Sequence, residues 1–248
     1  MSHAKPLEGR VALVTGASRG IGYHAAKGFA AAGAHVVAVA RTVGGLEELD
    51  DEIKSLGGGA TLVPLDLKDF EGIDRLGAAL HERWGRLDVL FANAGILGQL
   101  SPLGHVPPKV WDAVIAVNVT ANWRLIRSLD PLLRKSDAGR ALFMSSGAAK
   151  NLRPFWGPYS VSKAALEALA RTYAGEVTKT PIRVVVIDPG RTRTAMRAQA
   201  MPGEDPATLP APSEIVRYLI EMASPAFTRT NVLFAFPART YTDFPGAS

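Results

Sequence analysis

Short apolar runs alternate with longer amphipathic segments along the whole 248-residue chain. The runs consist almost entirely of valine, isoleucine, leucine and alanine, which is typical of strands buried on both faces of a parallel sheet. Seven runs predict strands: Arg10–Thr15, Ala34–Ala40, Ala60–Leu65, Leu87–Ala92, Arg140–Ser145, Ile182–Ile187 and Asn231–Ala235. We expect helices to cover both faces of the sheet they form.

Between these runs, apolar residues recur at the three- and four-residue spacing of amphipathic helices. Five such segments predict helices: Gly20–Ala32, Leu46–Leu56, Phe70–Trp84, Pro108–Arg134 and Tyr159–Val177. Strand and helix alternate without a linker or a repeat, so residues 1–248 are predicted to form one α/β domain, a Rossmann fold with a seven-stranded parallel sheet. The Pro- and Ala-rich segment 200–212 is predicted to be a loop, and residues 191–212 a lid over a substrate.

A glycine-rich turn joins the first strand to the first helix. Gly16, Gly20 and Gly22 recur in the segment Thr15-Gly-Ala-Ser-Arg-Gly-Ile-Gly22. Such glycines allow a tight turn and a close approach of the backbone to a pyrophosphate, while the helix N-terminus offers free N–H groups. The turn therefore predicts a dinucleotide site.

The end of the second strand indicates which dinucleotide binds. An acidic residue there would hold the ribose hydroxyls of NAD, but the chain has Ala40 and Arg41. With Arg19 from the glycine turn, Arg41 can pair with the 2′-phosphate of NADP. NADP(H) is therefore the preferred cofactor, with NAD(H) possible, although an arginine in a solvated loop would give the same sequence.

A tyrosine and a lysine stand one helical turn apart, Tyr159 and Lys163, so they project from the same helix face. A phenol has a pKa of about 10 and exchanges protons poorly at neutral pH unless a nearby cation favours the phenolate. Lys163 can supply that cation, and Ser146, which follows the fifth strand, can hold a substrate oxygen. These residues predict proton transfer at a carbonyl.

Together these motifs, with Asn93-Ala94-Gly95, Asn118 and Pro189-Gly190, resemble the short-chain dehydrogenase/reductase family, and in particular a bacterial subgroup of it. The resemblance spans nearly the whole chain. It implies an oxidoreductase that moves a hydride between NADP(H) and a carbonyl or alcohol, with Tyr159 as general acid or base.

The resemblance also assigns roles to individual residues. Lys163 would hold the nicotinamide ribose and lower the tyrosine pKa, Ser146 would orient the carbonyl, and Asn118 would anchor a relay water. The expected catalytic residues are Asn118, Ser146, Tyr159 and Lys163. The expected cofactor-binding residues are Gly16, Ser18, Arg19, Gly20, Ile21, Gly22, Arg41, Asp66, Leu67, Asn93, Ala94, Gly95, Tyr159, Lys163, Pro189, Gly190, Thr192 and Thr194.

The segments that would surround a substrate are mostly apolar, and they include Phe155 and Trp156. A hydrophobic or ring-bearing carbonyl compound would suit them, although a core role for both aromatic residues is equally compatible. Arg193 and Arg197 stand four apart and could hold an acidic substrate group, or could simply be solvated.

Composition narrows the remaining possibilities. The chain has no cysteine, its five histidines are dispersed, and its net charge of +5 is spread without a dense basic run. We therefore expect no transition metal, no disulfide and no nucleic-acid partner. No apolar run reaches the length of a membrane helix or signal peptide, so we expect a cytoplasmic protein that does not bind a membrane.

Three further expectations concern assembly and alternatives. By resemblance, the protein would form a homodimer or homotetramer and act on a small molecule. A non-catalytic NADPH-binding redox sensor is the main alternative, which need not retain the catalytic set. An isomerising or dehydrating enzyme would usually carry a longer C-terminal region than the one after Ile187.

Overall fold

A computed structural model describes residues 5–244 of the chain. Its centre is one eight-stranded sheet with the strand order β3-β2-β1-β4-β5-β6-β7-β8. The strands are β1 (Val11–Thr15), β2 (His35–Ala40), β3 (Gly59–Pro64), β4 (Val89–Ala92), β5 (Arg140–Met144), β6 (Arg183–Asp188), β7 (Val232–Ala235) and β8 (Thr240–Asp243). The first seven pair in parallel, which confirms the predicted α/β fold of the Rossmann type.

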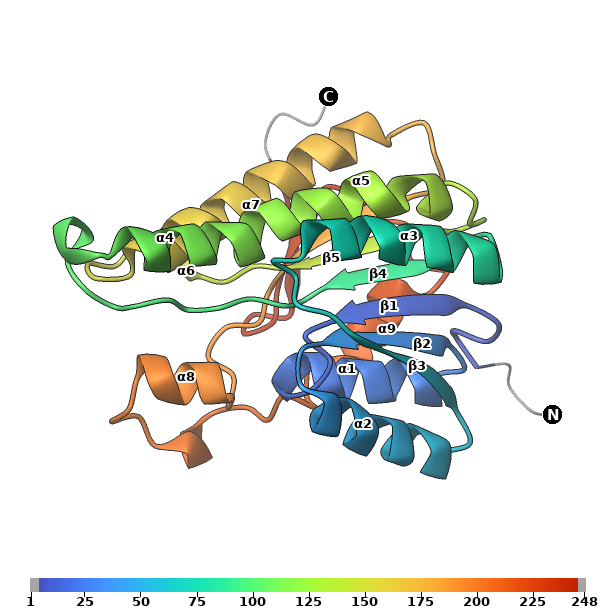
Figure 1. Ribbon diagram of the computed structural model, residues 1–248, viewed down its shortest axis with the longest axis horizontal. Coiled ribbons are helices and arrows are strands. Elements are labelled where there is room, and N and C mark those ends of the chain that lie inside the picture. The colour runs from blue at the N-terminus through green and yellow to red at the C-terminus, as the bar shows by residue number, and fades with distance from the viewer. Residues whose placement is uncertain (1–4, 245–248) are drawn as a thin grey trace.

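Helices cover both faces of the sheet, as its apolar strands require (Figure 1). On one face α3, α5 and α7 bury Ile73, Leu125 and Leu166 against the strands. On the other face α1, α2 and α9 contribute to a second core. The α-helices are α1 (Gly20–Ala31), α2 (Val43–Ser55), α3 (Phe70–Trp84), α4 (Pro108–Ile115), α5 (Ala121–Leu133), α6 (Ala148–Asn151), α7 (Gly157–Glu176), α8 (Ala195–Ala200) and α9 (Val216–Ala223). Short 3-10 turns, η1 (Leu103–His105) and η3 (Pro206–Thr208), complete the helical segments.

The prediction of seven strands was one strand short. β8 pairs antiparallel with β7 and forms the edge of the sheet. Its sequence, Thr-Tyr-Thr-Asp, is polar and mostly exposed, because an edge strand has a neighbouring strand on one side only. A search for continuous apolar runs therefore misses it.

The helical segments also differ from the predictions. The expected helix Pro108–Arg134 is divided by a π-helical turn, η2 (Ala116–Thr120), between α4 and α5. α8 and η3 lie in or beside the segment predicted to be a loop, and α9 was not predicted at all. These helices are only three to eight residues long, too short to show a clear helical period.

The strand order reverses between β1 and β4, whose neighbours on the other side are β2 and β5. At such a point the loops after adjacent strands turn to opposite faces and leave a crevice at the carboxyl edge of the sheet. In Figure 1, α4, α6 and α8 lie beyond this edge, and α8 projects away from the layers. The fold thus provides a cleft with a covering segment nearby.

Candidate active site

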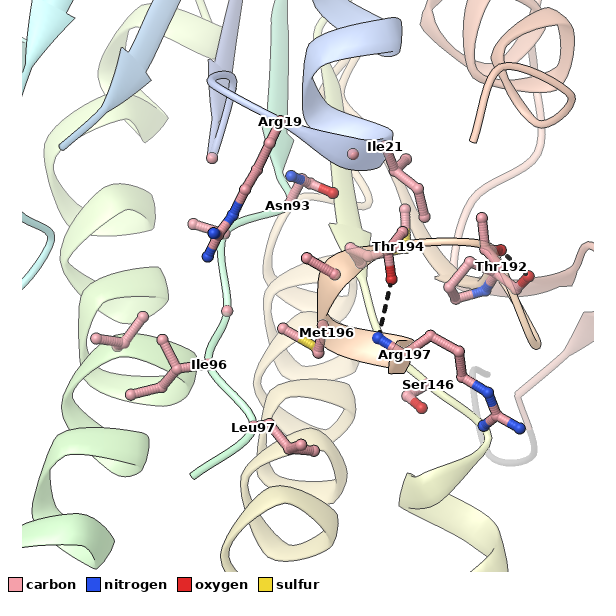
Figure 2. A pocket seen from close by; sticks show the side chains of 18 of the residues that line it. Arg19, Ile21, Asn93, Ile96, Leu97, Ser146, Thr192, Thr194, Met196 and Arg197 are labelled. Carbon is pink, nitrogen blue, oxygen red and sulfur yellow. Dashed lines mark hydrogen bonds between the residues drawn. The ribbon is translucent and has the colours of Figure 1, made fainter. Parts of the chain in front are cut away.

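A cavity of about 370 Å³ opens at this carboxyl edge. It is lined by residues at and after the carboxyl ends of β1 to β6, and by α7 and α8. In Figure 2, Thr194, Met196 and Arg197 come from the α8 segment, while Asn93, Ile96 and Leu97 come from the segment after β4. The predicted residues that line the cavity are Gly16, Ser18, Arg19, Gly20, Ile21, Arg41, Asp66, Leu67, Asn93, Ala94, Gly95, Ser146, Tyr159, Lys163, Pro189, Gly190, Thr192 and Thr194. Of the predicted set, Gly22 and Asn118 lie behind this lining.

The glycine turn has the shape that an anion site needs. Gly16 and Gly20 have φ angles of +68° and +59°, a region that favours glycine. A Cβ atom on Gly22 would lie 2.3 Å from the Gly16 carbonyl oxygen, so only glycine lets α1 start this close to the turn. No side chain caps the N-terminus of α1. Its first N–H groups therefore remain available to a phosphate.

The Asn93-Ala94-Gly95 segment is held by β1. The Thr15 hydroxyl accepts hydrogen bonds from the Asn93 and Ala94 amides, both at 3.0 Å, and the Asn93 side chain donates to the Thr15 carbonyl at 2.9 Å. A Cβ atom on Gly95 would lie 3.3 Å from the Asn118 side-chain oxygen, a tight contact, and 3.5 Å from the Lys163 ammonium, an ordinary one. The segment therefore lines the cleft with Gly95 packed beside Asn118 and Lys163.

The outer end of the cleft carries two exposed arginines. Arg41 is 59% exposed, and its guanidinium lies 3.9 Å from the Asp66 carboxylate, which also faces Lys68 at 3.8 Å. The Arg19 guanidinium has no hydrogen bond or ion pair with another described residue. The contact between Asp66 and Arg41 was not expected from the sequence. A 2′-phosphate at this end would meet two guanidinium groups that make only a long, exposed ion pair or none with other described residues, and both could therefore bind it.

The predicted proton-transfer residues lie together at the inner end of the cleft. Tyr159 is 7% exposed and Lys163 is 3% exposed, both on the first turns of α7. The Lys163 ammonium donates to the Met144 carbonyl at 2.7 Å and lies 5.7 Å from the centre of the Tyr159 ring. The Tyr159 phenol hydrogen bonds with Ser146. The spacing in the sequence thus corresponds to a contiguous cluster.

Burial shifts both titratable groups toward their neutral forms. Burial raises the pKa of Tyr159 to about 12, against the hydrogen bond with Ser146, and the Asp188 carboxylate raises it further. Burial also lowers the pKa of Lys163 to about 8, while Glu167 opposes this shift. Without a ligand, Tyr159 is therefore a protonated acid at neutral pH. The pKa of Tyr159 is thus raised in the free protein, where a lowered pKa was expected, because desolvation by burial outweighs the hydrogen bond with Ser146.

Asn118 lies beside the site and is held by hydrogen bonds within the fold. It is fully buried in the π-helical turn, where its side chain exchanges two hydrogen bonds with the Ile96 backbone, at 2.8 and 2.9 Å, and donates a third to Ser162. Asn122 donates to its main-chain carbonyl at 2.8 Å. Its side chain thus ties η2 to α7 and to the segment after β4.

The two lid arginines considered for an acidic substrate group, Arg193 and Arg197, differ in exposure and pairing. Arg193 is exposed, whereas Arg197 is only 17% exposed and pairs with Glu204 through two hydrogen bonds, at 2.5 and 2.7 Å. Arg191 lies 3.6 Å from the same carboxylate. Arg193 matches the solvated alternative, and Arg197 is already engaged within the segment.

Three acidic residues beside the site were not singled out as functional, and Trp156, which was expected near the substrate, lies against Tyr159. Asp188 ends β6, Glu167 follows Lys163 by one turn and accepts a hydrogen bond from Ser145 at 2.7 Å, Glu204 binds Arg197, and Trp156 packs edge-on against Tyr159 with ring centres 6.2 Å apart. Only Glu167 carried a sequence signal, its i, i+4 spacing from Lys163.

Two negative findings concern the described residues 5–244. No group of three or more His, Asp or Glu side chains is arranged there to hold a metal ion. Within the same range, every helix is too short or too polar to cross a membrane.

Comparison with known proteins identifies the class. A family model described as short chain dehydrogenase matches residues 10–205. The chain therefore belongs to the short-chain dehydrogenase family of oxidoreductases, which confirms the resemblance drawn from its motifs.

Individual relatives narrow the placement to a bacterial subgroup. YciK, an uncharacterized oxidoreductase of Escherichia coli K12, is 40% identical over 238 residues, 94% of either chain. The structure of a short chain dehydrogenase from Pseudomonas syringae is 42% identical, with a TM-score of 0.87, and covers 91% of this chain and 93% of that one. One from Shigella flexneri, complexed with NADP, is 37% identical, with a TM-score of 0.90 and coverage of 95% and 100%.

Proposed function

We propose that this protein transfers a hydride between NADP(H) and a carbonyl or alcohol substrate, with Tyr159 as the general acid or base. The observation that carries the proposal is the cluster of Ser146, Tyr159 and Lys163 at the inner end of a cleft that begins at the glycine turn. The NADP complex of the Shigella flexneri relative supports the choice of cofactor.

The cofactor residues fit a dinucleotide along the whole cleft. The free N–H groups of α1 would hold the pyrophosphate, and Arg19 and Arg41 would pair with the 2′-phosphate. Asn93, Ala94 and Gly95 would line the adenosine side of the cleft. The chemistry that NADP(H) supplies when bound is a hydride donor or acceptor.

In the reducing direction, Ser146 and Tyr159 would both donate hydrogen bonds to the substrate oxygen. The high pKa of Tyr159 keeps its proton available at neutral pH, and the proton passes to the oxygen as negative charge develops there. The Lys163 ammonium, fixed by the Met144 carbonyl, favours the resulting phenolate. In oxidation the same groups would act in reverse.

The walls beside Tyr159 favour a neutral, apolar substrate. Leu97, Tyr159 and Ala200 form a small buried cluster, and the partly buried residues packed on it are Leu100, Ala148, Trp156, Met196 and Met201. Arg197, which could attract an acidic group, is neutralised by Glu204. An alkyl or aromatic aldehyde or ketone should therefore react better than a keto acid of equal size.

The lid assignment for residues 191–212 remains part of this proposal. The α8 segment projects beyond the layers of the fold and lines the cavity through Met196 and Arg197 (Figure 1). If it closes over a substrate, NADPH together with an active substrate will slow limited proteolysis within this segment. Unchanged cleavage would reject the lid.

One experiment tests the proposed activity directly. The protein is incubated with NADPH and a panel of aldehydes, ketones and quinones, and the loss of NADPH absorbance is recorded for the native chain and for Tyr159→Phe. Turnover that depends on Tyr159 supports the proposal. Tight NADPH binding without any turnover would favour a redox-sensing protein instead, and tighter binding of NADH than of NADPH would reject the cofactor preference.

A further inference from the structure

The carboxylate of Asp188 connects the two loops that flank the reacting position. Its Oδ1 atom accepts a hydrogen bond from the Gly147 amide at 2.9 Å and another from the Gly190 amide at 3.0 Å. Gly147 directly follows Ser146, and Gly190 follows Pro189 in the cleft lining. A single oxygen atom thus joins the loop after β5 to the loop after β6.

Asp188 is the acceptor for both amides, and neither the Gly147 amide nor the Gly190 amide has another acceptor among the described residues. Gly190 has a φ angle of +64°, and a Cβ atom there would lie 2.3 Å from the Pro237 ring. Only glycine fits this backbone conformation, in which the Gly190 amide points toward Asp188 at the end of β6. Gly147 is the N-cap residue of a single helical turn, α6, whose first amide, that of Ala148, donates to the Ser146 hydroxyl at 3.2 Å. The Asp188 side chain satisfies amides that neither the sheet nor α6 satisfies.

We propose that Asp188 is a positioning residue that sets the distance between Ser146 and the Pro189–Gly190 turn on the two sides of the substrate carbonyl. This proposal deepens the proposed function and rests on it for its catalytic consequence. The structural part, the tie between the two loops, stands independently of any activity.

The charge of Asp188 adds a second effect. Asp188 forms no ion pair with another described residue, and it lines a neighbouring cavity of about 540 Å³ together with Ser146 and Trp156. The charged groups near the Tyr159 phenol are Lys163 on its own helix and Asp188 from β6, while Arg197 of the lid segment lines the same cavity and is paired with Glu204. Arg153 and Arg191 line the neighbouring cavity with Asp188. Asp188 raises the pKa of Tyr159 and so favours the protonated acid that reduction requires.

Two substitutions separate the tie from the charge. Asp188→Asn keeps a side-chain oxygen that can accept both amides but removes the charge. Asp188→Ala removes both. Asp112→Asn makes the same chemical change as the first at an exposed position on α4 and serves as the control.

The first readout needs neither cofactor nor substrate. Hydrogen exchange of the Gly147 and Gly190 amides is measured by NMR in the free proteins. We expect exchange at both amides to become at least about tenfold faster in Asp188→Ala and to stay within about threefold in Asp188→Asn. Unchanged exchange in Asp188→Ala would overturn the positioning role even if the enzyme proves active.

The second readout is the pH profile of NADPH-dependent reduction with a substrate found by the screen. Removing the negative charge lowers the pKa of Tyr159, so the alkaline loss of activity should move to lower pH in Asp188→Asn, but not in Asp112→Asn. A profile that does not move would overturn the charge effect. Absence of turnover in the native chain would instead reject the proposed function. The hydrogen-exchange result would then still test whether Asp188 holds the two loops together.

Discussion

The two ends of strand β5 each hold a buried cation, and the protein treats them differently. At the first residue, Arg140 is 2% exposed and its guanidinium donates to five main-chain carbonyls, those of Gly139, Pro181, Ser224, Pro225 and Phe227. At the last residue, Met144, the carbonyl accepts a single hydrogen bond from Lys163, which is 3% exposed.

This difference separates a structural cation from a functional one. The hydrogen bonds of Arg140 join β5 to the loops before β6 and after α9, and they leave it no access to a ligand. Lys163 has fewer bonds and faces the cleft beside Tyr159 and Gly95. Burial lowers the pKa of both groups, to about 10 for Arg140 and about 8 for Lys163. A buried cation with few partners is costly to the fold, and it is found where a ligand can complete its surroundings.

The largest effect we expect is chemical and is confined to the carboxyl end. Tyr159→Phe removes the proton donor and should lower kcat for NADPH-dependent reduction about a thousandfold. The matched control is Tyr173→Phe, a substitution on the same helix as Tyr159. It removes a hydroxyl that donates a hydrogen bond to Asp130 of α5. The control should keep its activity and lose only about 1 kcal/mol of stability. Equal losses of activity in the two variants would contradict the assignment of Tyr159.

The next effect is on stability at the amino end. Arg140→Met leaves buried carbonyls without donors and should reduce the free energy of unfolding by about 3 kcal/mol in urea denaturation. Arg183→Met, at the start of the neighbouring strand, removes a partly exposed guanidinium bound to the carbonyls of Thr180, Ile182 and Thr228, and should cost about 1 kcal/mol. A smaller loss in Arg140→Met than in Arg183→Met would disprove the structural role.

Lys163→Met should raise the free energy of unfolding, whereas Arg140→Met should lower it. The pKa of Lys163 falls from 10.5 to about 8 on folding, so the charged form destabilises the native state below pH 8. As pH rises from about 8 to 10.5, the unfolded chain loses its proton too and this penalty disappears. We therefore expect Lys163→Met to be more stable than the native chain by about 2 kcal/mol near pH 7, with the difference shrinking toward pH 10.5.

Urea denaturation of both proteins across this pH range measures the effect. The variant should also lose most of its NADPH-dependent activity, because the cation beside Tyr159 is gone. A stability difference that stays constant with pH would show that Lys163 is not an unfavourably buried charge in the native protein.

The smallest effect concerns an exposed cation at the outer end of the cleft. Arg41→Ala should weaken NADPH binding about tenfold and leave NADH binding unchanged, because only NADPH carries the 2′-phosphate. Fluorescence titration measures both. Arg75→Ala removes an equally exposed arginine paired with Asp69 and should change neither. Similar weakening of NADPH and NADH by Arg41→Ala would place this side chain away from the phosphate.

Most of the fold was predictable because its strands are buried on both faces and therefore show continuous apolar runs. The cluster of Ser146, Tyr159 and Lys163 was predictable because helix spacing fixes the last two on one face, and the parallel sheet brings strand ends to one edge. β8 was missed because an edge strand needs no apolar run.

Other parts of the site depend on interactions that leave no local pattern. The Arg197–Glu204 pair joins residues seven apart in a segment without periodicity. Asp188 lies inside an apolar strand and turn, and its two amide partners belong to loops brought together only by the sheet. The direction of the Tyr159 pKa shift depends on burial, which the sequence does not report.

The π-helical turn at Ala116–Thr120 has a consequence for how this sequence tolerates length changes. A π turn accommodates one more residue than an α-helix of the same length, so α4 and α5 are out of α-helical phase by about one residue. Deleting a single residue between Ala116 and Thr120 would allow one continuous α-helix with regular hydrogen bonds. The same deletion would rotate Asn118 away from Ile96 and Ser162, so the more regular helix would belong to a protein with a disrupted site.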